Sequence, residues 1–206
     1  MNLTWNGSDG ASSVLLLAHG AGADMNHEYM AYFAGKLGSA DLAVARFNFR
    51  YTDEKRRAPD KQPVLEDTYR EAVQRVTDER SPRRLFVGGK SMGGRIGSHI
   101  VADGTRVDGL VYLGYPLHPP GRPDRIRDAH LGDIKSPQLF VEGTRDPFCP
   151  LDTLAEVIGK RRLKADVVVI DDGDHSLKVR KSSGRSTEQA WDEAISAIAT
   201  WIKRIG

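Results

Sequence analysis

The segment Leu85–Arg95 constrains the fold of this chain more than any other part of it. An apolar run, Leu85–Gly88, leads directly into a Gly-Lys-Ser-Met-Gly sequence centred on Ser91. Between a strand and a helix, such a pattern is typical of a sharp turn that strains the serine backbone and exposes its hydroxyl. The turn has no room for side chains at positions 89 and 93, and both are glycine. Because the chain contains 21 glycines, the pattern gains its weight from its place at a predicted strand-to-helix junction.

Short apolar runs alternate with helical patterns along the rest of the chain. The predicted strands cover residues 14–18, 42–49, 85–88, 110–114, 138–142 and 167–170. The last of these is an uninterrupted β-branched run, which predicts a strand covered on both faces. The predicted helices cover residues 26–37, 63–76, 91–102 and 151–159, and a last one begins at the capping sequence Ser186–Gln189. This alternation predicts an α/β fold, with a mostly parallel sheet of about six or seven strands flanked by helices on both faces. One domain over residues 1–206, without a large lid domain, accounts for the length.

Composition excludes several classes of protein. The formal net charge is +2 and the basic residues are scattered among acidic ones, so we expect no binding to nucleic acid. The apolar run Val14–Ala18 is too short for a signal peptide or a membrane span, which favours a cytoplasmic protein. Cys149 is the only cysteine, so neither a disulfide within the chain nor a zinc cluster is expected. We predict a buried, unreactive thiol at this position and no metal or organic cofactor.

Ser91 needs a base to accept its proton and an acidic residue to orient that base. Ligands bind at the carboxyl ends of parallel strands, so the residues that follow the strands are the candidates. Asp146 follows the fifth predicted strand and precedes Pro147, which favours an extended conformation at Asp146. His175 follows the sixth predicted strand. The order Ser91, Asp146, His175 is the one expected for a catalytic triad on this architecture.

Other interpretations of these positions stay open. An aspartate that precedes a helix is also suited to cap a turn or helix, and a loop histidine is often merely solvated. Asp171, Asp172 and Asp174 lie in the same loop as His175 and are rival acids. We expect the side chain of Asp174 to project away from His175, because the two residues are adjacent.

A triad of this kind also needs N–H donors for the oxyanion. Met92 offers its backbone N–H at the start of a helix. The loop His19–Asp24, which reads His-Gly-Ala-Gly-Ala-Asp, lets the backbone approach a ligand, and we assign the second donor to Ala21. The loop also fits a plain Gly-rich turn. It lacks the Gly-Lys-Ser/Thr ending of a P-loop and the spacing of a dinucleotide fingerprint.

With these motifs in place, the chain resembles the α/β-hydrolases from Val14 to Ile205. The motifs that carry the resemblance are His19–Gly22, Gly89–Gly94, Gly143–Pro147 and Gly173–Ser176. Within that superfamily the chain is similar to the dienelactone-hydrolase-like branch. Through the stretch Leu113–Gly121 it resembles, more closely, small proteins related to a subunit of a chromatin acetyltransferase complex.

The resemblance implies a serine hydrolase fold with an acyl-enzyme mechanism. Dienelactone hydrolases have a cysteine where this chain has Ser91, which argues against a dienelactone as the substrate. Some relatives serve as protein-interaction subunits, so the resemblance also leaves a non-catalytic role open.

The connection between the fourth and fifth predicted strands indicates what covers the site. It has about twenty residues and is rich in proline and charge, whereas lipid-cleaving relatives carry a long apolar lid there. We therefore expect a small, partly polar substrate. Tyr115, His118 and Phe148 are predicted to contact it, although His118 also suits a loop residue held by its prolines. Basic residues such as Lys178 border the predicted site, where they either favour an anionic substrate or form a solvated face.

Together these observations predict a carboxylesterase-like serine hydrolase that cleaves a small ester, thioester or amide. Its expected partner is a small-molecule acyl substrate, while a protein partner or a homo-oligomer stays open. Two alternatives remain: a protein-interaction module on the same scaffold with little or no activity, and an acyltransferase that uses the same site.

Overall fold

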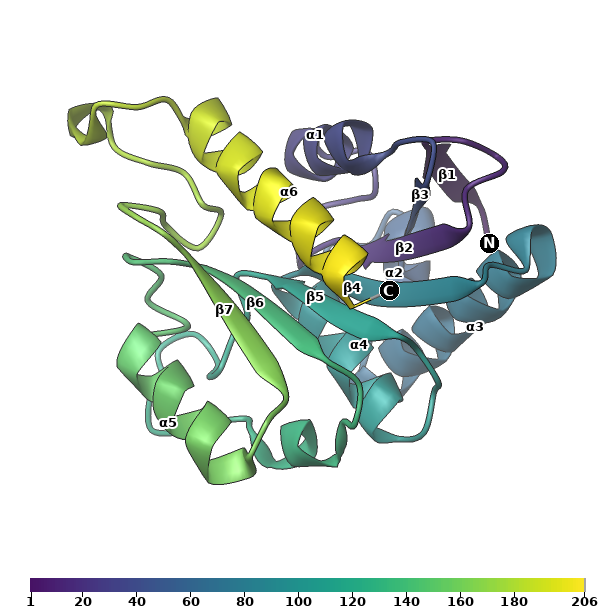
Figure 1. Cartoon of the computed structure of the whole chain (residues 1–206). Coiled ribbons are helices and arrows are strands. Elements are labelled where there is room, and N and C mark those ends of the chain that lie inside the picture. The colour runs from purple at the N-terminus through teal and green to yellow at the C-terminus, as the bar shows by residue number, and fades with distance from the viewer. Residues whose placement is uncertain (206) are drawn as a thin grey trace.

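A seven-stranded sheet forms the centre of the computed structural model, which describes residues 1–205 (Figure 1). The strand order is β1-β3-β2-β4-β5-β6-β7. β1 runs antiparallel to β3, and all the other neighbouring strands are parallel. The strands are β1 (Leu3–Asn6), β2 (Ser13–Ala18), β3 (Leu42–Phe47), β4 (Arg84–Lys90), β5 (Gly109–Leu113), β6 (Gln138–Gly143) and β7 (Ala165–Ile170).

Helices cover both faces of this sheet, and each face has its own hydrophobic core (Figure 1). The helices are α1 (Glu28–Leu37), α2 (Arg50–Asp53), α3 (Gln62–Arg80), α4 (Met92–Ala102), α5 (Leu151–Arg161) and α6 (Thr187–Arg204), with short 3₁₀ turns η1 (Ala129–Asp133) and η2 (Lys181–Ser183). α1 and α6 pack on one face, while α3, α4 and α5 pack on the other. The mostly parallel α/β sheet predicted from the sequence is confirmed.

Local sequence signals account for the ends of several helices. The Ser186 hydroxyl accepts a hydrogen bond from the Gln189 N–H, and the Gln189 side chain bonds back to the Ser186 N–H, which completes the capping box of α6. Pro63 lies in the first turn of α3, where its missing N–H costs nothing. All six residues of β2 are buried, as expected for a central strand covered on both faces.

Two expectations about the edges of the sheet are wrong. β1 was not expected, because its four residues are only partly apolar and the segment Met1–Ser13 is polar overall. The β-branched run Val167–Ile170 was expected to be covered on both faces. It lies in the edge strand β7 instead, and its Val167 and Val169 side chains are 40% and 42% exposed.

The parallel strands β2 to β7 all end at one end of the sheet, and four of the loops that follow them carry the predicted triad and oxyanion residues. These are the loops that follow β2, β4, β6 and β7. The connection from β5 to β6 holds only the single 3₁₀ turn η1 and no additional domain. Over residues 1–205, no helix combines the length and the apolar character needed to span a membrane.

Candidate active site

The turn after β4 holds Ser91 in an uncommon backbone conformation, with φ 51° and ψ −115°. Positive φ is strained for a serine, so the surrounding structure must impose it. A methyl group added at Gly89 or Gly93 would overlap the carbonyl oxygen of Ala18 in β2. The two glycines therefore let α4 begin directly against the neighbouring strand, as the sequence predicts.

A chain of two hydrogen bonds connects Ser91, His175 and Asp146. The Ser91 Oγ lies 2.8 Å from His175 Nε2, and the Asp146 Oδ2 lies 2.7 Å from His175 Nδ1. Because a carboxylate only accepts, Nδ1 carries the proton and Nε2 accepts from the serine hydroxyl. The Asp146 side chain is fully buried, whereas that of His175 is 22% exposed. The structure thus brings the three predicted residues together with a base in reach of the hydroxyl.

Asp146 also fixes its own loop. Its Oδ1 accepts a hydrogen bond of 2.8 Å from the Phe148 N–H, while Oδ2 faces His175. The Phe148 ring packs edge-on against the imidazole, with centroids 4.7 Å apart. The turn-capping contact and the contact with His175 therefore coexist in one carboxylate.

The rival acids of the His175 loop have other partners. Asp174 accepts hydrogen bonds from the N–H groups of Ser176 and Lys178, so its carboxylate is turned into its own loop. Asp172 pairs with Arg180 and Arg145, and these contacts hold its pKa below the ordinary value.

The loop after β2 lies opposite the serine. Met92 is the first residue of α4, so its N–H has no partner within the helix. Ala21 lines the same pocket as Ser91. The fully buried His19 braces this loop, because its Nδ1 lies 2.8 Å from the Gly20 carbonyl oxygen and its Nε2 accepts from the Phe49 N–H at 3.3 Å. His19 belongs to one of the motifs that carry the family resemblance, but its bracing role was not predicted.

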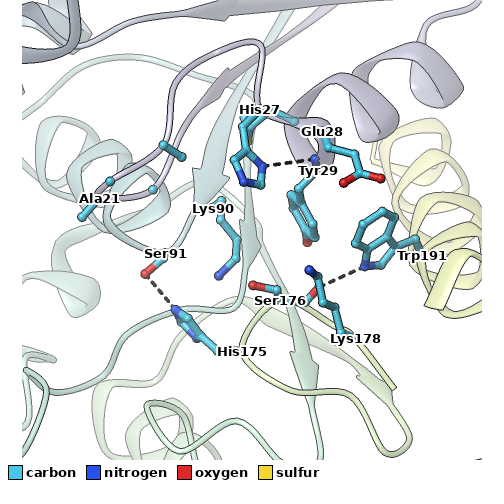
Figure 2. A pocket seen from close by; sticks show the side chains of 14 residues that line it. Ala21, His27, Glu28, Tyr29, Lys90, Ser91, His175, Ser176, Lys178 and Trp191 are labelled. Atoms are coloured by element: carbon cyan, nitrogen blue, oxygen red, sulfur yellow. Dashed lines mark hydrogen bonds between the residues drawn. The ribbon is translucent and has the colours of Figure 1, made fainter. Parts of the chain in front are cut away.

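A pocket of about 330 Å³ opens beside Ser91 (Figure 2). The loop after β2, the first turn of α1, the end of β4, the His175 loop and Trp191 of α6 form its wall. Two of its side chains, Tyr29 and Lys90, were not among the predicted site residues. Burial lowers the pKa of Lys90 to about 8, and nearby carboxylates oppose this shift.

None of the three side chains predicted to contact a substrate lines this pocket. Tyr115 was expected to face the site, but its ring is fully buried and its hydroxyl lies 3.1 Å from the Ser98 Oγ. His118 is 6% exposed, with its ring nitrogens 3.0 Å from the carbonyl oxygens of Pro119 and Pro147. Both side chains hold neighbouring segments together. Phe148 borders the imidazole instead.

A buried carboxyl group lies beneath the triad. Glu142 in β6 is fully buried and accepts a hydrogen bond of 2.7 Å from the Tyr115 N–H. Burial, followed by the charge of Asp146, raises its pKa well above the ordinary value, so its neutral form is favoured. Cys149, which contacts Glu142, is fully buried with a raised pKa, as expected for an unreactive thiol.

Comparison with known proteins gives one family and many similar folds. A family model described as an alpha/beta hydrolase domain matches residues 11–203. An alpha-beta serine hydrolase homologue from Coxiella burnetii is 18% identical, with a TM-score of 0.76 over 96% of this chain and 88% of that one. Dienelactone hydrolase from Anabaena variabilis is 19% identical, with a TM-score of 0.77 over 98% and 90%. An α/β serine hydrolase without lid from Xanthomonas campestris is 16% identical, with a TM-score of 0.74 over 97% and 88%.

Proposed function

The chain belongs to the α/β-hydrolase family, and from this premise we propose that it is a serine hydrolase that cleaves small carboxylic esters or related acyl bonds. The observation that carries the proposal is the hydrogen-bonded chain from Ser91 through His175 to Asp146. Three residues from three separate loops meet in a geometry suited to nucleophilic catalysis. A thioester or an amide is open to the same chemistry.

In the proposed mechanism, Ser91 attacks the carbonyl carbon while His175 Nε2 accepts the serine proton. Collapse of the tetrahedral intermediate breaks the bond to the leaving group, which takes that proton from His175. Water then attacks the acyl-enzyme with the same base, which releases the acid and restores Ser91. Asp146 holds the imidazole in the required tautomer and stabilises its charged form.

The backbone N–H groups of Met92 and Ala21 are the proposed oxyanion donors. Both lie beside Ser91, one at the start of α4 and one in the loop that His19 braces. Preformed N–H donors stabilise the developing charge without reorganising, and each typically lowers the barrier by about 3 kcal/mol.

Labelling with a fluorophosphonate probe tests the proposal directly. We expect the probe to attach to the peptide that carries Ser91, and the purified protein to hydrolyse short activated esters. Ser91→Ala should fold normally, fail to label and lose at least about 10³-fold in kcat. A folded Ser91→Ala variant with full activity would exclude the mechanism. Product analysis with an added alcohol separates hydrolysis from acyl transfer.

A further inference from the structure

The pocket beside Ser91 contains two hydrogen-bond donors that have no partner. Tyr29 is only 4% exposed and its hydroxyl is buried. Within residues 1–205, that hydroxyl has no hydrogen-bond partner. Asp146, Glu142 and Asp174 act on the Lys90 ammonium through their charge, and none of the three bonds to it. Figure 2 shows the hydroxyl end of Tyr29 and the ammonium end of Lys90 directed toward the same part of the pocket, next to Ser176. A buried donor without a partner is costly, and a ligand oxygen that accepts from the Tyr29 hydroxyl would remove that cost while it also meets the half-buried Lys90 ammonium.

The position of Lys90 places its charge beside the reacting groups. Lys90 precedes Ser91 in the chain. A methyl group added at Gly114 would lie 3.3 Å from Lys90 Nζ and 3.2 Å from His175 Nδ1, so the ammonium and the imidazole share one side of that glycine. A substrate group that meets the ammonium therefore lies a short distance from the bond that Ser91 attacks.

The carboxylates near Lys90 are occupied elsewhere. Asp146 bonds to His175, and Asp174 accepts from the N–H groups of its own loop. Glu142 accepts from the Tyr115 N–H, and its raised pKa favours the neutral acid. Glu28 also lines the pocket, but it is exposed at the rim. The positive charge of Lys90 thus has no dedicated counter-ion within the described part of the chain.

We propose that the substrate carries a carboxylate next to the scissile bond, and that Lys90 and Tyr29 bind its two oxygens. The inference rests on the proposed function and names the substrate class of the same site. A carboxylate has one acceptor oxygen for each of the two donors, and a charge-assisted bond to an ammonium is among the stronger polar contacts. The carboxylate belongs either to the acyl group or to the alcohol, and the chemistry of recognition is the same for both.

Matched esters test the proposal with the wild-type protein. Monoethyl succinate, with the charge on the acyl side, is compared with its uncharged analogue ethyl 4-methylpentanoate. For the alcohol side, 4-acetoxybutanoate is compared with 4-methylpentyl acetate. All four are followed by acid release, and we expect kcat/KM for the charged member of at least one pair to be about tenfold higher or more. Equal or lower values for the charged member of both pairs overturn the proposal.

Three variants identify the source of any preference. Lys90→Met removes the charge and keeps much of the side-chain volume, so the charged-to-uncharged ratio should fall to about one or below. Tyr29→Phe removes only the hydroxyl and should lower the ratio several-fold. Lys36→Met, on the solvent side of α1, is the control for a general loss of positive charge and should leave the ratio unchanged. An unchanged ratio in Lys90→Met also overturns the proposal.

A binding measurement separates this inference from the proposed function. In Ser91→Ala, an NMR titration should detect binding of monoethyl succinate or 4-acetoxybutanoate, and Ser91→Ala/Lys90→Met should bind it at least about tenfold more weakly. If no ester is hydrolysed and the probe does not label Ser91, the proposed function fails, while this titration still decides the carboxylate site. If the probe labels Ser91 but neither carboxylate binds, only the present inference fails.

Discussion

At the scale of single residues, Asp146 divides its two carboxylate oxygens between two partners. Oδ1 accepts from the Phe148 N–H and Oδ2 faces His175. Asp146→Asn can keep an oxygen toward Phe148, but it then presents an NH₂ group to Nδ1, which favours the wrong tautomer of the imidazole. We expect kcat to fall on the order of 10⁴-fold while the protein stays folded.

Ester kinetics combined with circular dichroism check this prediction. Asp171→Asn is the matched control, because Asp171 is an exposed acid in the same loop as His175. Its activity should stay close to that of the wild type. Comparable losses in the two variants would mean that the charge of the loop matters and that the contact with His175 does not.

Lys90 gives the selectivity for charged esters a pH dependence. Burial lowers its pKa to about 8 from an ordinary value of 10.5, so the ammonium is present below pH 8 and is lost as the pH rises through that value. The ratio of kcat/KM for monoethyl succinate to that for ethyl 4-methylpentanoate should therefore fall above about pH 8. The ratio cancels effects of pH that both esters share. A ratio that stays constant from pH 7 to 10 contradicts the prediction.

The sequence predicts some residues of this site much better than others. Ser91, Asp146 and His175 follow strands and stand in a recognisable order, so the topology that collects strand ends also collects them. Lys90 and Tyr29 carry no such signal, because one is the variable position of the Gly-x-Ser-x-Gly turn and the other lies within a helix. The prediction that Tyr115 faces the site was wrong, because the direction of a side chain just after β5 depends on the turn that follows the strand. The one available clue to Lys90 was its place directly before the predicted nucleophile Ser91.

At the scale of elements, the contact between β2 and the first turn of α4 requires a residue without a side chain at position 93. A methyl group at Gly93 would overlap the Ala18 carbonyl oxygen, and neither backbone segment is free to move. Gly93→Ala should lower the free energy of unfolding by about 2 kcal/mol or more. It should also reduce activity, because Ser91 lies only two residues before Gly93.

Urea denaturation checks this prediction against a matched glycine. Gly159 lies in α5, where an added methyl group would meet nothing within 4 Å. Gly159→Ala should therefore raise the free energy of unfolding by up to about 1 kcal/mol. If both substitutions change stability in the same direction, packing at the elbow does not explain the effect.

The central elements were predictable and the edges of the sheet were not. β2, β4 and β6 each contain a buried apolar run, and α6 combines a capping box with a regular apolar stripe. β1 forms because its backbone pairs with β3, a contact that its own side chains barely signal. Val167 and Val169 suit a strand through their branched side chains, but strand propensity does not say what covers them.

At the scale of the whole molecule, the short path from β5 to β6 leaves the pocket open. Only η1 interrupts it, so no helical cover has to move before a substrate enters. The rate of hydrolysis of 4-nitrophenyl butyrate should therefore follow a simple saturation curve through the solubility limit of the ester. A sudden rise at the point where droplets form would contradict this expectation, since such a rise is the behaviour of an enzyme that opens at an interface.

The long separation in sequence between Ser91 and His175 affects when the site can form in the nascent chain during translation. These residues are 84 positions apart, and the indole N–H of Trp191 in α6 donates to the Ser176 carbonyl oxygen beside His175. Domains emerge from the ribosome amino end first, so the nucleophile turn is made long before the imidazole has its support. With the proposed function, a half-translated chain lacks its base and hydrolyses no ester, so the onset of ester hydrolysis would report that synthesis has passed α6.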